Sequence, residues 1–217
     1  MRDWQNRRIV ITAGPTREKL DPVRYLSNES SGRMGWALAT AAREAGARVT
    51  LVAGPTGLEN PPKVNVVAVT SAREMLSATR QAARGAHVVI GAAAVADWRP
   101  LKLSRTKLKK GQTAPVLRLT PNPDILGTLA RARRGPFPRL AGFALESNHL
   151  LANARKKMVD KNLDLIVANP PSALGNAKTR AWILQPGRPP EAFRGDKKIL
   201  ARQILARLLE TVNAHDR

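Results

Sequence analysis

Apolar segments of strand length alternate with amphipathic segments of helix length through the first half of the chain. Four segments rich in Val, Ile and Ala predict buried strands at residues 8–12, 47–55, 64–69 and 87–94. Helical patterns lie between them at residues 34–46 and 72–84. Ser71 and Glu74 form a capping-box pair at the start of the second helical pattern. Strands that alternate with helices in this way are typical of right-handed βαβ units in a parallel sheet.

The second half of the chain repeats the alternation after an interruption. Residues 98–121 begin as a Lys-rich stretch without periodicity and end in an alternating segment, 116–120, that predicts a half-exposed strand. Further strands are expected at 139–146, 163–170, 180–186 and 191–195, the last two as an antiparallel pair. Helices are expected at 121–134, 148–162 and 196–214. Asn122 is the expected cap of the first of these helices, with Pro123 in its first turn, and Asp196 is the expected cap of the last.

These elements together predict an α/β fold. We expect a Rossmann-like, doubly wound, mostly parallel sheet with helices on both faces and a small antiparallel extension. No repeat or linker interrupts the pattern, so residues 1–217 are expected to form a single domain.

Composition removes several classes of protein. The chain has no cysteine, which excludes a disulfide scaffold, a thiolate nucleophile and any cysteine-based metal site. Its three histidines are far apart in sequence, so a His-rich metal site is not expected. No apolar run reaches the length of a membrane span, and no apolar segment of a signal peptide follows the charged N-terminus. We therefore expect a cytoplasmic protein without a membrane partner.

The charge balance is strongly basic, with 37 Lys and Arg against 16 Asp and Glu and a formal net charge of +21 at pH 7. A basic nucleic-acid-binding module is one interpretation of this excess. Aromatic residues make up only 4% of the chain, which leaves few platforms for stacking on bases. Binding of a small, strongly anionic substrate fits the charge equally well.

A long polar loop, Gly14–Gly35, separates the first strand from the first helix. Loops of this length are commonly functional, and a helix N-terminus favours negative charge. Ligands of open α/β sheets bind at the carboxyl ends of the strands. The loops that begin near residues 94, 146 and 169 start at this carboxyl edge of the sheet, as does the loop after the first strand. The sequence therefore predicts one anion-binding cleft, built from loops that are far apart in the chain.

Six blocks of sequence make the interpretation specific. They read ITAGPTREKLDPVRYLSNESSGRMG, GAAAVADWRP, KLKK, NPDIL, GFALES and KKMVDKNLDLIVAN. In this order they resemble the phosphopantothenoylcysteine synthetase (phosphopantothenate–cysteine ligase) family, the C-terminal ligase half of a bifunctional coenzyme A biosynthesis flavoprotein. The resemblance implies that CTP, with Mg²⁺, activates 4′-phosphopantothenate as an acyl-cytidylate and releases pyrophosphate. Cysteine then forms the amide and releases CMP.

The resemblance also implies roles for individual residues. The implied catalytic residues are Asn28, Arg24 and Lys107. The implied substrate-binding residues are Gly14, Ser30, Ser31 and Gly32. The implied nucleotide-binding residues are Gly91, Ala92, Ala93, Asp97, Lys107, Asn122, Pro123, Asp124, Ile125, Phe143, Lys157 and Lys161. The metal ligands are unknown.

Each of these residues can also have an ordinary structural role. Gly14 can serve a tight turn, and Asn28 can serve an Asx turn. Arg24 can form a surface ion pair with Asp21 or Glu18. The corresponding roles elsewhere are close packing for Gly91–Ala93, a solvated turn for Asp97, a solvated loop for Lys107 and a core position for Phe143.

The resemblance leaves the organisation of the whole protein open. The flavin-dependent decarboxylase half and its cysteine are absent from this chain, so no flavin is expected. The chain is either a free-standing ligase beside a separate decarboxylase chain or a piece of a longer protein. Residues 177–196 match less tightly, and family usage implies a homodimerisation hairpin there. A nicotinamide-dependent reductase of Rossmann type is the alternative enzyme, but no GxGxxG follows the first strand and the only tyrosine, Tyr25, lacks a lysine four residues on.

Overall fold

An eight-stranded sheet organises the structure, which is a computed structural model that describes residues 4–110, 116–173 and 178–214. The strand order is β12-β11-β10-β9-β6-β1-β4-β5. The six strands from β10 to β5 in this order are parallel, and β11 and β12 add an antiparallel pair at one edge. The strands are β1 (Arg8–Ala13), β4 (Arg48–Ala53), β5 (Asn65–Ala68), β6 (Val88–Gly91), β9 (Arg139–Leu145), β10 (Leu165–Asn169), β11 (Lys178–Leu184) and β12 (Glu191–Asp196).

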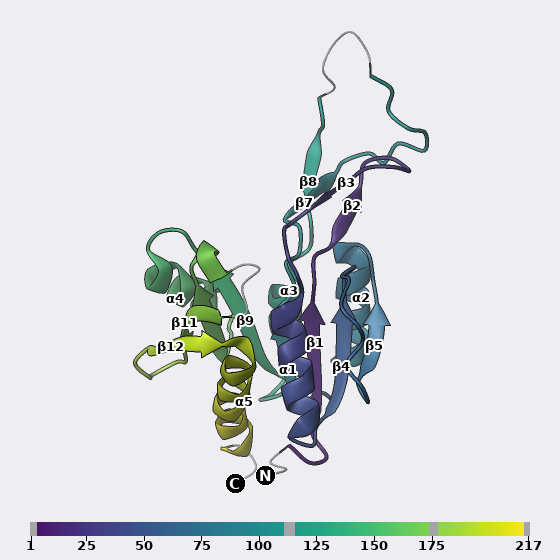
Figure 1. The fold of residues 1–217 in the computed structure, drawn as a ribbon. Helices are drawn as coiled ribbons and strands as arrows, with labels where there is room; N and C mark the ends of the chain where they lie inside the picture. The colour runs from purple at the N-terminus through teal and green to yellow at the C-terminus, as the bar shows by residue number, and fades with distance from the viewer. Residues whose placement is uncertain (1–3, 111–115, 174–177, 215–217) are drawn as a thin grey trace.

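Helices cover both faces of this sheet, as the sequence predicts (Figure 1). The helices are α1 (Arg33–Glu44), α2 (Ala72–Ala82), α3 (Ile125–Ala132), α4 (Leu150–Asp160) and α5 (Lys197–Asn213). α1 and α5 pack on one face, where Ile9 and Ile11 of β1 join their core cluster. α2, α3 and α4 pack on the other face, where Val10 joins theirs. This alternation along one strand follows from the two-residue period of strand side chains.

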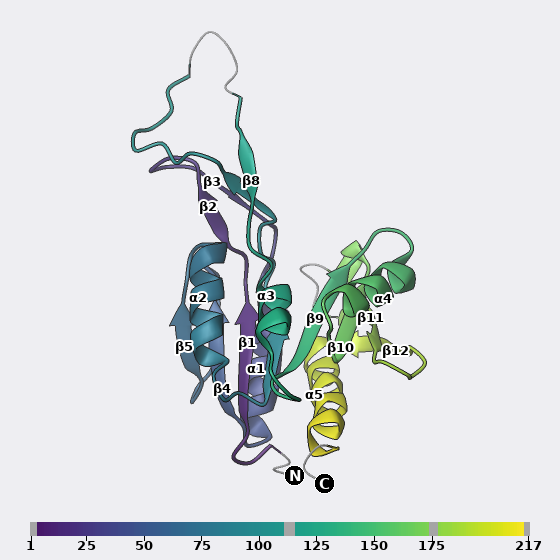
Figure 2. The same cartoon turned by 180° about the vertical axis from the view of Figure 1, so that it is seen from behind.

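A two-layered arm extends from the body at the carboxyl ends of the parallel strands (Figures 1 and 2). It consists of the antiparallel pairs β2 (Arg17–Lys19) with β3 (Tyr25–Ser27) and β7 (Trp98–Pro100) with β8 (Leu119–Pro121). The prediction that residues 14–35 form one loop is wrong, because β2 and β3 form a hairpin within this range. Three-residue strands carry too little apolar alternation to be predicted from local pattern alone.

Two further predictions need correction, and two segments fall outside the described residues. Asn122 does not cap α3, because that helix begins at Ile125 and its cap is Asp124. The strand expected at 116–120 lies at Leu119–Pro121. The expected antiparallel extension is confirmed, because β11 and β12 form an antiparallel pair at the edge of the main sheet. Residues 111–115 of the Lys-rich segment and residues 174–177, at the start of the expected dimerisation hairpin, lie outside the described residues.

Two expected helix caps are confirmed. The Ser71 hydroxyl accepts a hydrogen bond from Glu74 N at the start of α2, and the Asp196 carboxylate accepts one from Lys198 N at the start of α5. Among the described residues, none of the helices is both long enough and apolar enough to span a bilayer.

Candidate functional site

A cavity of about 640 Å³ opens at the carboxyl ends of the parallel strands. Thr12, Gly91, Phe143 and Asn169, each near the end of a different strand, contribute to its wall. The loops that precede α1 and follow β6 supply nearly half of the remaining lining. The cavity therefore lies at the sheet edge where the sequence predicts a cleft, between loops that are distant in the chain.

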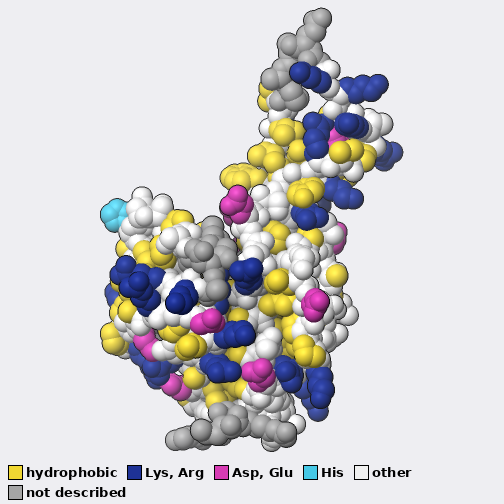
Figure 3. All heavy atoms as spheres, in the orientation of Figure 1, with side chains coloured by type: hydrophobic (Ala, Val, Ile, Leu, Met, Phe, Trp, Pro, Cys, Tyr) yellow, Lys and Arg dark blue, Asp and Glu magenta, His cyan; other side chains and the backbone are white. Residues whose placement is uncertain are grey.

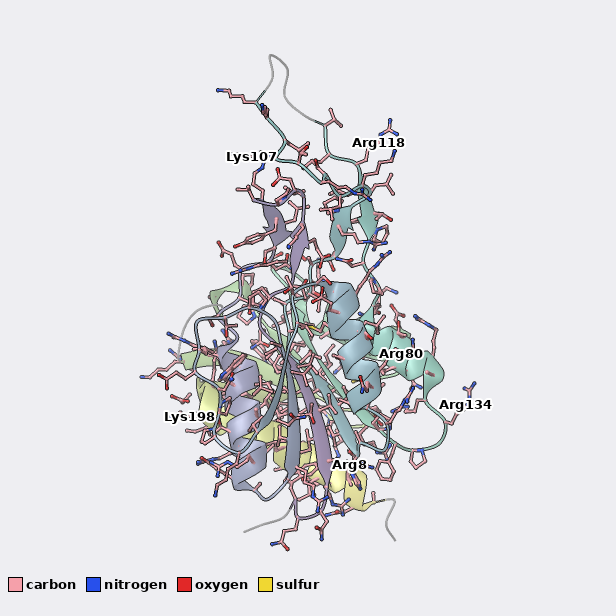
Figure 4. The ribbon with its side chains drawn as sticks, turned by 90° about the vertical axis from the view of Figure 1, so that its right-hand side faces the viewer. Arg8, Arg80, Lys107, Arg118, Arg134 and Lys198 are labelled. Carbon is pink, nitrogen blue, oxygen red and sulfur yellow. The ribbon has the colours of Figure 1, made fainter. Side chains whose placement is uncertain are left out.

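Most residues singled out from the sequence line this cavity. They are Asn28, Ser30, Ser31, Gly32, Gly91, Ala92, Ala93, Asp97, Asn122, Pro123, Asp124, Ile125, Phe143, Lys157 and Lys161. Three residues singled out from the sequence, Gly14, Arg24 and Lys107, are not part of the lining. Arg24 and Lys107 belong to the arm, where Lys107 lies well away from Arg8 at the opposite end of the molecule (Figure 4).

Gly14 occupies a tight turn immediately after β1. Its φ of +76° lies in the left-handed region, and a Cβ there would come within 2.9 Å of Thr56 Cγ2 and 3.0 Å of Gly54 O. Only glycine meets both conditions without strain. The role of a turn glycine therefore accounts for this residue, which shapes the start of the loop.

Asn28 connects the two loops that form the centre of the cavity. Its Nδ2 donates a hydrogen bond of 2.9 Å to the carbonyl of Val95, in the loop after β6. The bond fixes the orientation of the amide. Nearby, Ser30 Oγ accepts a hydrogen bond of 3.3 Å from Gly32 N, just before α1 begins. Small residues at Gly91–Ala93 form another part of the wall, where a ligand can approach the backbone closely.

Two lysines of the α4 region are bonded to protein acceptors inside the cavity. Lys157 Nζ donates to the carbonyl of Phe143 at 2.9 Å, and Lys161 Nζ lies 2.8 Å from Asp124 Oδ2. Burial, followed by the nearby charge of Lys161, lowers the pKa of the Lys157 ammonium. Burial raises the pKa of the Asp124 carboxyl, but the Lys161 contact and the hydrogen bond from Gly127 N outweigh it, so the net pKa is lowered.

Arg33 and Lys197 form a second cationic part of the lining, which sequence reasoning missed. Arg33 is the first residue of α1, and Lys197 is the first residue of α5. Burial, followed by the positive charge of Arg33, lowers the pKa of the Lys197 ammonium. Lys and Arg side chains are also visible around α1 and α5 in the space-filling view (Figure 3).

The sequence signals for the missed residues differ in strength. Arg33 and Asn169 lie within blocks that carry the resemblance, so their positions were marked although their roles were not. Lys197 follows the expected cap Asp196, which places it at a helix N-terminus. Nothing local marks Thr179. The rest of the lining that sequence reasoning did not single out is Thr12, Glu29, Met34, Ala94, Val95, Ala96, Leu126 and Leu145.

Asp21 holds the arm together through a buried carboxylate. Its Oδ1 accepts hydrogen bonds from Val23 N and Arg24 N, and its Oδ2 accepts from the Arg24 guanidinium and, at 3.1 Å, from Leu108 N. The hydrogen bond from Arg24 holds the pKa of Asp21 well below its usual range. Arg24 Nη2 also donates to Leu108 O at 2.8 Å, so the pair anchors the segment that carries Lys107. Arg24 thus forms an ion pair with Asp21, one of the two structural partners expected from the sequence. The other, Glu18, accepts a hydrogen bond from Ala72 N.

The arm also exposes an unusual amount of apolar surface. Most of the large hydrophobic side chains that are exposed in the described residues belong to it or to its connecting segments: Val23, Tyr25, Trp98, Leu101, Leu103, Leu108, Val116, Leu117 and Leu119. Contiguous exposed apolar surface commonly marks a protein–protein contact.

The described residues contain no group of three or more His, Cys, Asp or Glu side chains that could by themselves hold a metal ion. The carboxylates of the cavity are Glu29, Asp97 and Asp124, and Asp124 is paired with Lys161. Mg²⁺ is commonly held by one or two carboxylates together with substrate phosphates, and Glu29 and Asp97 fit that pattern.

Comparisons with known proteins identify the family of the chain. The family model for the DNA/pantothenate metabolism flavoprotein C-terminal domain matches residues 4–212. A coenzyme A biosynthesis bifunctional protein CoaBC of Vibrio vulnificus (strain CMCP6) is 41% identical over 217 residues, which cover 97% of this chain and 54% of the relative. The CoaBC protein of Escherichia coli (strain K12) is 47% identical over 170 residues, covering 77% of this chain and 42% of the relative. The chain thus spans about half the length of the curated relatives that it matches.

The fold has a solved counterpart. The crystal structure of the C-terminal domain of a coenzyme A biosynthesis bifunctional protein CoaBC superposes with a TM-score of 0.86 at 38% identity. The superposition covers 99% of this chain and 100% of that one.

Proposed function

The chain belongs to the DNA/pantothenate metabolism flavoprotein C-terminal domain family, and we propose that it is the phosphopantothenate–cysteine ligase of coenzyme A biosynthesis. It joins 4′-phosphopantothenate to cysteine with the consumption of a nucleoside triphosphate, in the cytoplasm. The observation that carries this proposal is the cavity at the sheet edge. It combines cationic side chains, a wall of small residues and the oriented amide of Asn28.

In the first step, a carboxylate oxygen of phosphopantothenate attacks the α-phosphorus of CTP. A new P–O bond forms, the bond to the bridging oxygen of the β-phosphate breaks, and pyrophosphate leaves with the electron pair. Such transfers depend mainly on positioning and on electrostatic stabilisation of the phosphoryl oxygens. The cationic lining screens the two anions as they meet. Asn28 binds the acyl carbonyl, because its amide is held in place by Val95 O.

In the second step, the neutral amine of cysteine attacks the acyl carbon of the mixed anhydride. The C–N bond forms, the C–O bond to phosphate breaks, and CMP leaves with the electron pair while the amine loses a proton to solvent. A donor near the acyl oxygen stabilises the charge that develops there. Asn28 is the side chain we assign to this role.

For the nucleotide, we assign the base to the part of the cavity near Phe143 and Asp97. When bound together with the triphosphate, Mg²⁺ would neutralise part of the charge on the phosphate oxygens. Glu29 is the lining carboxylate that would hold it, since Asp97 is assigned to the base and Asp124 is paired with Lys161. Asp124 is assigned to positioning, since it caps α3 and pairs with Lys161.

We further propose a homodimer that forms through the arm. The arm exposes Leu103, Leu119 and its other apolar side chains. It also places Arg24 and Lys107 outside the cavity of their own chain. A second copy would cover the apolar surface and bring these two cations to the cavity of the partner. Residues 177–196, the interface expected from the sequence, stay a prediction, and their strands β11 and β12 lie at one edge of the main sheet.

Light scattering after size-exclusion chromatography tests the dimer. The wild type is expected to have twice the mass of one chain. The double variant Leu103→Asp/Leu119→Asp is expected to be a monomer. Val159→Asp, at an exposed site on α4, is the control and stays dimeric. A mixture of Arg24→Ala and Asn28→Ala proteins is expected to regain activity, because mixed dimers contain one site with both residues intact. A monomeric wild type, or a mixture without regained activity, contradicts the arrangement.

The decisive test of the function is release of pyrophosphate when CTP, phosphopantothenate and cysteine are combined, with the amide identified by mass spectrometry. Replacing CTP with ATP in this assay shows which nucleotide the enzyme uses. Adding EDTA shows whether the reaction needs Mg²⁺. No pyrophosphate with any triphosphate rejects the ligase. Titration with NADPH distinguishes the ligase from the alternative reductase. Tight binding of NADPH without binding of a nucleoside triphosphate would favour the reductase. The decarboxylase that consumes the product resides in another chain or another segment.

A further inference from the structure

Exposed arginines gather at the amino ends of the parallel strands, on the face of the sheet that α2 and α3 cover. We call this group the amino-edge arginine surface, and its members are Arg8, Arg48, Arg80, Arg84 and Arg134. Arg8 and Arg48 are the first residues of β1 and β4, Arg80 lies in the last turn of α2, Arg84 follows that helix, and Arg134 follows α3. Figure 4 shows the labelled members Arg8, Arg80 and Arg134 away from the arm. The surface therefore lies at the end of the strands opposite the cavity.

Strand register and packing bring these arginines together. Arg8 and Arg48 are direct partners in the parallel pair of β1 with β4. Both side chains point to the α2 face, because Ile9 and Val49, the next residues of the two strands, belong to the core on the other face. The Arg8 guanidinium reaches the end of α2, where a Cβ built at Gly85 would collide with its Nη2. α2 packs beside α3 (Figure 2), which brings the arginine after α3 to the same face.

No acidic side chain of the described residues balances this surface. Within the described part of the chain, none of the five guanidinium groups forms an ion pair or a hydrogen bond. The segments around them contain no Asp or Glu at residues 45–58, 75–96 and 125–145. Asp164, just before β10, is already shared by Arg133 and Arg139.

The cations near α5 are arranged differently. There, arginines pair with glutamates: Arg188 with Glu210, Arg202 with Glu44 and Arg207 with Glu191. At the amino edge, like charges face one another instead, with Arg8 opposite Arg48 and Arg80 one turn before Arg84. Such pairs lower stability unless something compensates them. The dipole of α2 favours cations only near its last turn, so it offsets no cost at Arg48 or Arg134. An anion from outside the chain would offset the rest.

The chemistry of the amino-edge arginine surface favours a ligand that carries several phosphates. All five cations are arginines, and a guanidinium group binds phosphate oxygens in a bidentate manner. None of the large hydrophobic side chains that are exposed in the described residues belongs to α2, α3 or the loop after α3. Membrane-binding helices and the cores of protein–protein interfaces both use such side chains. Single-stranded nucleic acids are usually held by stacking on aromatic rings as well, and no exposed ring of the described residues lies here. A nucleic-acid duplex, bound through its phosphates alone, fits these properties.

We propose that the amino-edge arginine surface binds the phosphate backbone of double-stranded RNA without reading its sequence. The deep, narrow major groove of A-form RNA brings the phosphates of both strands close together. A compact group of arginines therefore meets more phosphates on an RNA duplex than on B-form DNA, whose major groove is wide enough to admit a helix. This binding is separate from the proposed ligase reaction, because none of the five arginines lines the cavity.

Fluorescence anisotropy with a labelled RNA duplex, measured over a series of KCl concentrations, tests the proposal. For the wild type, the logarithm of the binding constant should fall linearly with the logarithm of the KCl concentration, with a slope between about −3 and −5. A second RNA duplex of unrelated sequence should bind within about twofold of the first, because phosphates carry no sequence information. A DNA duplex of the same sequence and the separated RNA strands should both bind more weakly.

Two double variants each remove a pair of charges from the surface. Arg80→Gln/Arg84→Gln alters the end of α2, and Arg48→Gln/Arg134→Gln alters two other elements, so the two pairs test the surface independently. Each is expected to weaken RNA binding and to reduce the magnitude of the salt slope by about 2, about 1 for each lost phosphate contact. Release of pyrophosphate by the ligase should be unchanged in both.

Arg155→Gln/Arg202→Gln is the matched control. These arginines lie on α4 and α5, are exposed, and belong neither to the surface nor to the cavity lining. The control removes the same net charge and should keep the affinity and the salt slope of the wild type. Thermal unfolding of all variants checks that each remains folded.

Several results overturn the inference. One is the absence of RNA binding by the wild type, and another is an equal change of slope in the control, which would show that net charge alone attracts the RNA. Tighter binding of the DNA duplex or of the single strands contradicts the choice of RNA duplex. Vesicles of anionic phospholipid, or polyglutamate, that bind as tightly and through the same arginines would assign the surface to a membrane or to an acidic protein instead.

Discussion

Asn28 Nδ2 donates a hydrogen bond of 2.9 Å to Val95 O and so fastens the loop after β1 to the loop after β6. The two residues are separated by 67 positions in the sequence. The bond leaves one side of the amide oriented by the protein and the other available to the cavity. It gives Asn28 a defined geometry that an Asx turn within its own loop does not require.

Asn28→Asp is expected to reduce kcat about tenfold or more while the Kd for CTP changes by less than about twofold. The carboxylate removes the donor to Val95 O and places a negative charge beside the acyl intermediate. Steady-state kinetics and calorimetry measure the two quantities. Asn148→Asp, at an exposed position outside the cavity lining, is the control. Equal loss of turnover and of CTP binding would contradict the role.

Asp124 contributes to stability in two separable ways. Its carboxylate caps α3 through Gly127 N and pairs with Lys161. Asp124→Ala loses both contacts and is expected to cost about 1–2 kcal/mol of unfolding free energy in urea. Asp124→Asn keeps a capping oxygen and loses the ion pair, which is partly exposed and contributes little, so it should cost less than half as much. Equal costs would show that the ion pair, not the cap, dominates.

The Asp124 carboxyl makes the free energy of unfolding depend on pH, in a direction set by its pKa shift. The folded state lowers the pKa of Asp124, so its stabilisation is present above the ordinary aspartate pKa of about 3.9. It is lost as the pH falls from about 4 through the lower folded value. Urea unfolding at a series of pH values should therefore show a difference between wild type and Asp124→Asn that narrows in acid. A difference that widens below about pH 4 would contradict the direction of the shift.

Gly35 allows α1 to approach β1 closely. A Cβ at this position would lie 2.2 Å from Ala13 Cβ and 3.1 Å from Ala13 Cα. Gly35→Ala is expected to lower the unfolding free energy by about 1–3 kcal/mol through overpacking. Gly57→Ala, where no atom lies within 4 Å of the added Cβ, should be nearly neutral. Adding Ala13→Gly to Gly35→Ala should restore part of the lost unfolding free energy. If the free-energy changes of the two substitutions simply add, the cost of Gly35→Ala does not come from its contact with Ala13.

Asp21 is expected to control the order of the arm segment that carries Lys107. Asp21→Asn weakens its contacts with Arg24 and Leu108 N. Hydrogen exchange at the Leu108 amide should accelerate on the order of tenfold, while core amides of β1 keep their protection. Asp160→Asn, which breaks the exposed pair with Lys156, is the control. Slow exchange at Leu108 in Asp21→Asn would show that other contacts hold the segment.

Acid should not release this segment in the wild type. Arg24 holds the pKa of Asp21 well below its usual range, so the carboxylate stays ionised and its contacts persist down to strongly acidic pH. Protection of the Leu108 amide, corrected for intrinsic exchange, should be the same at neutral pH and near the ordinary aspartate pKa of about 3.9. Loss of protection near that pKa would contradict this expectation.

The sheet and its helices follow from local pattern because each element buries its own apolar face. Ile9, Val10 and Ile11 illustrate the point, since two-residue alternation alone assigns them to opposite faces of the sheet. The position of the cavity also follows from the sequence, because loops after parallel strands meet at one edge. The quoted blocks marked most of its lining. Short strands such as β2 and β7, and the cap at Asp124 rather than Asn122, were beyond local pattern.

The α/β architecture, the edge of the sheet where the cavity lies and the blocks that carry the family resemblance can thus all be predicted without a structure. These are properties of periodicity and of short contiguous motifs. The three-dimensional structure was needed to show that Arg24 and Lys107 lie on an arm outside the cavity and that Lys157 donates a hydrogen bond to Phe143 O. It also places Lys197 and Arg33 in the lining of one cavity, because α5 packs beside α1 although the two helices are far apart in the sequence. Contacts of this kind depend on the packing of distant elements, which no local pattern records.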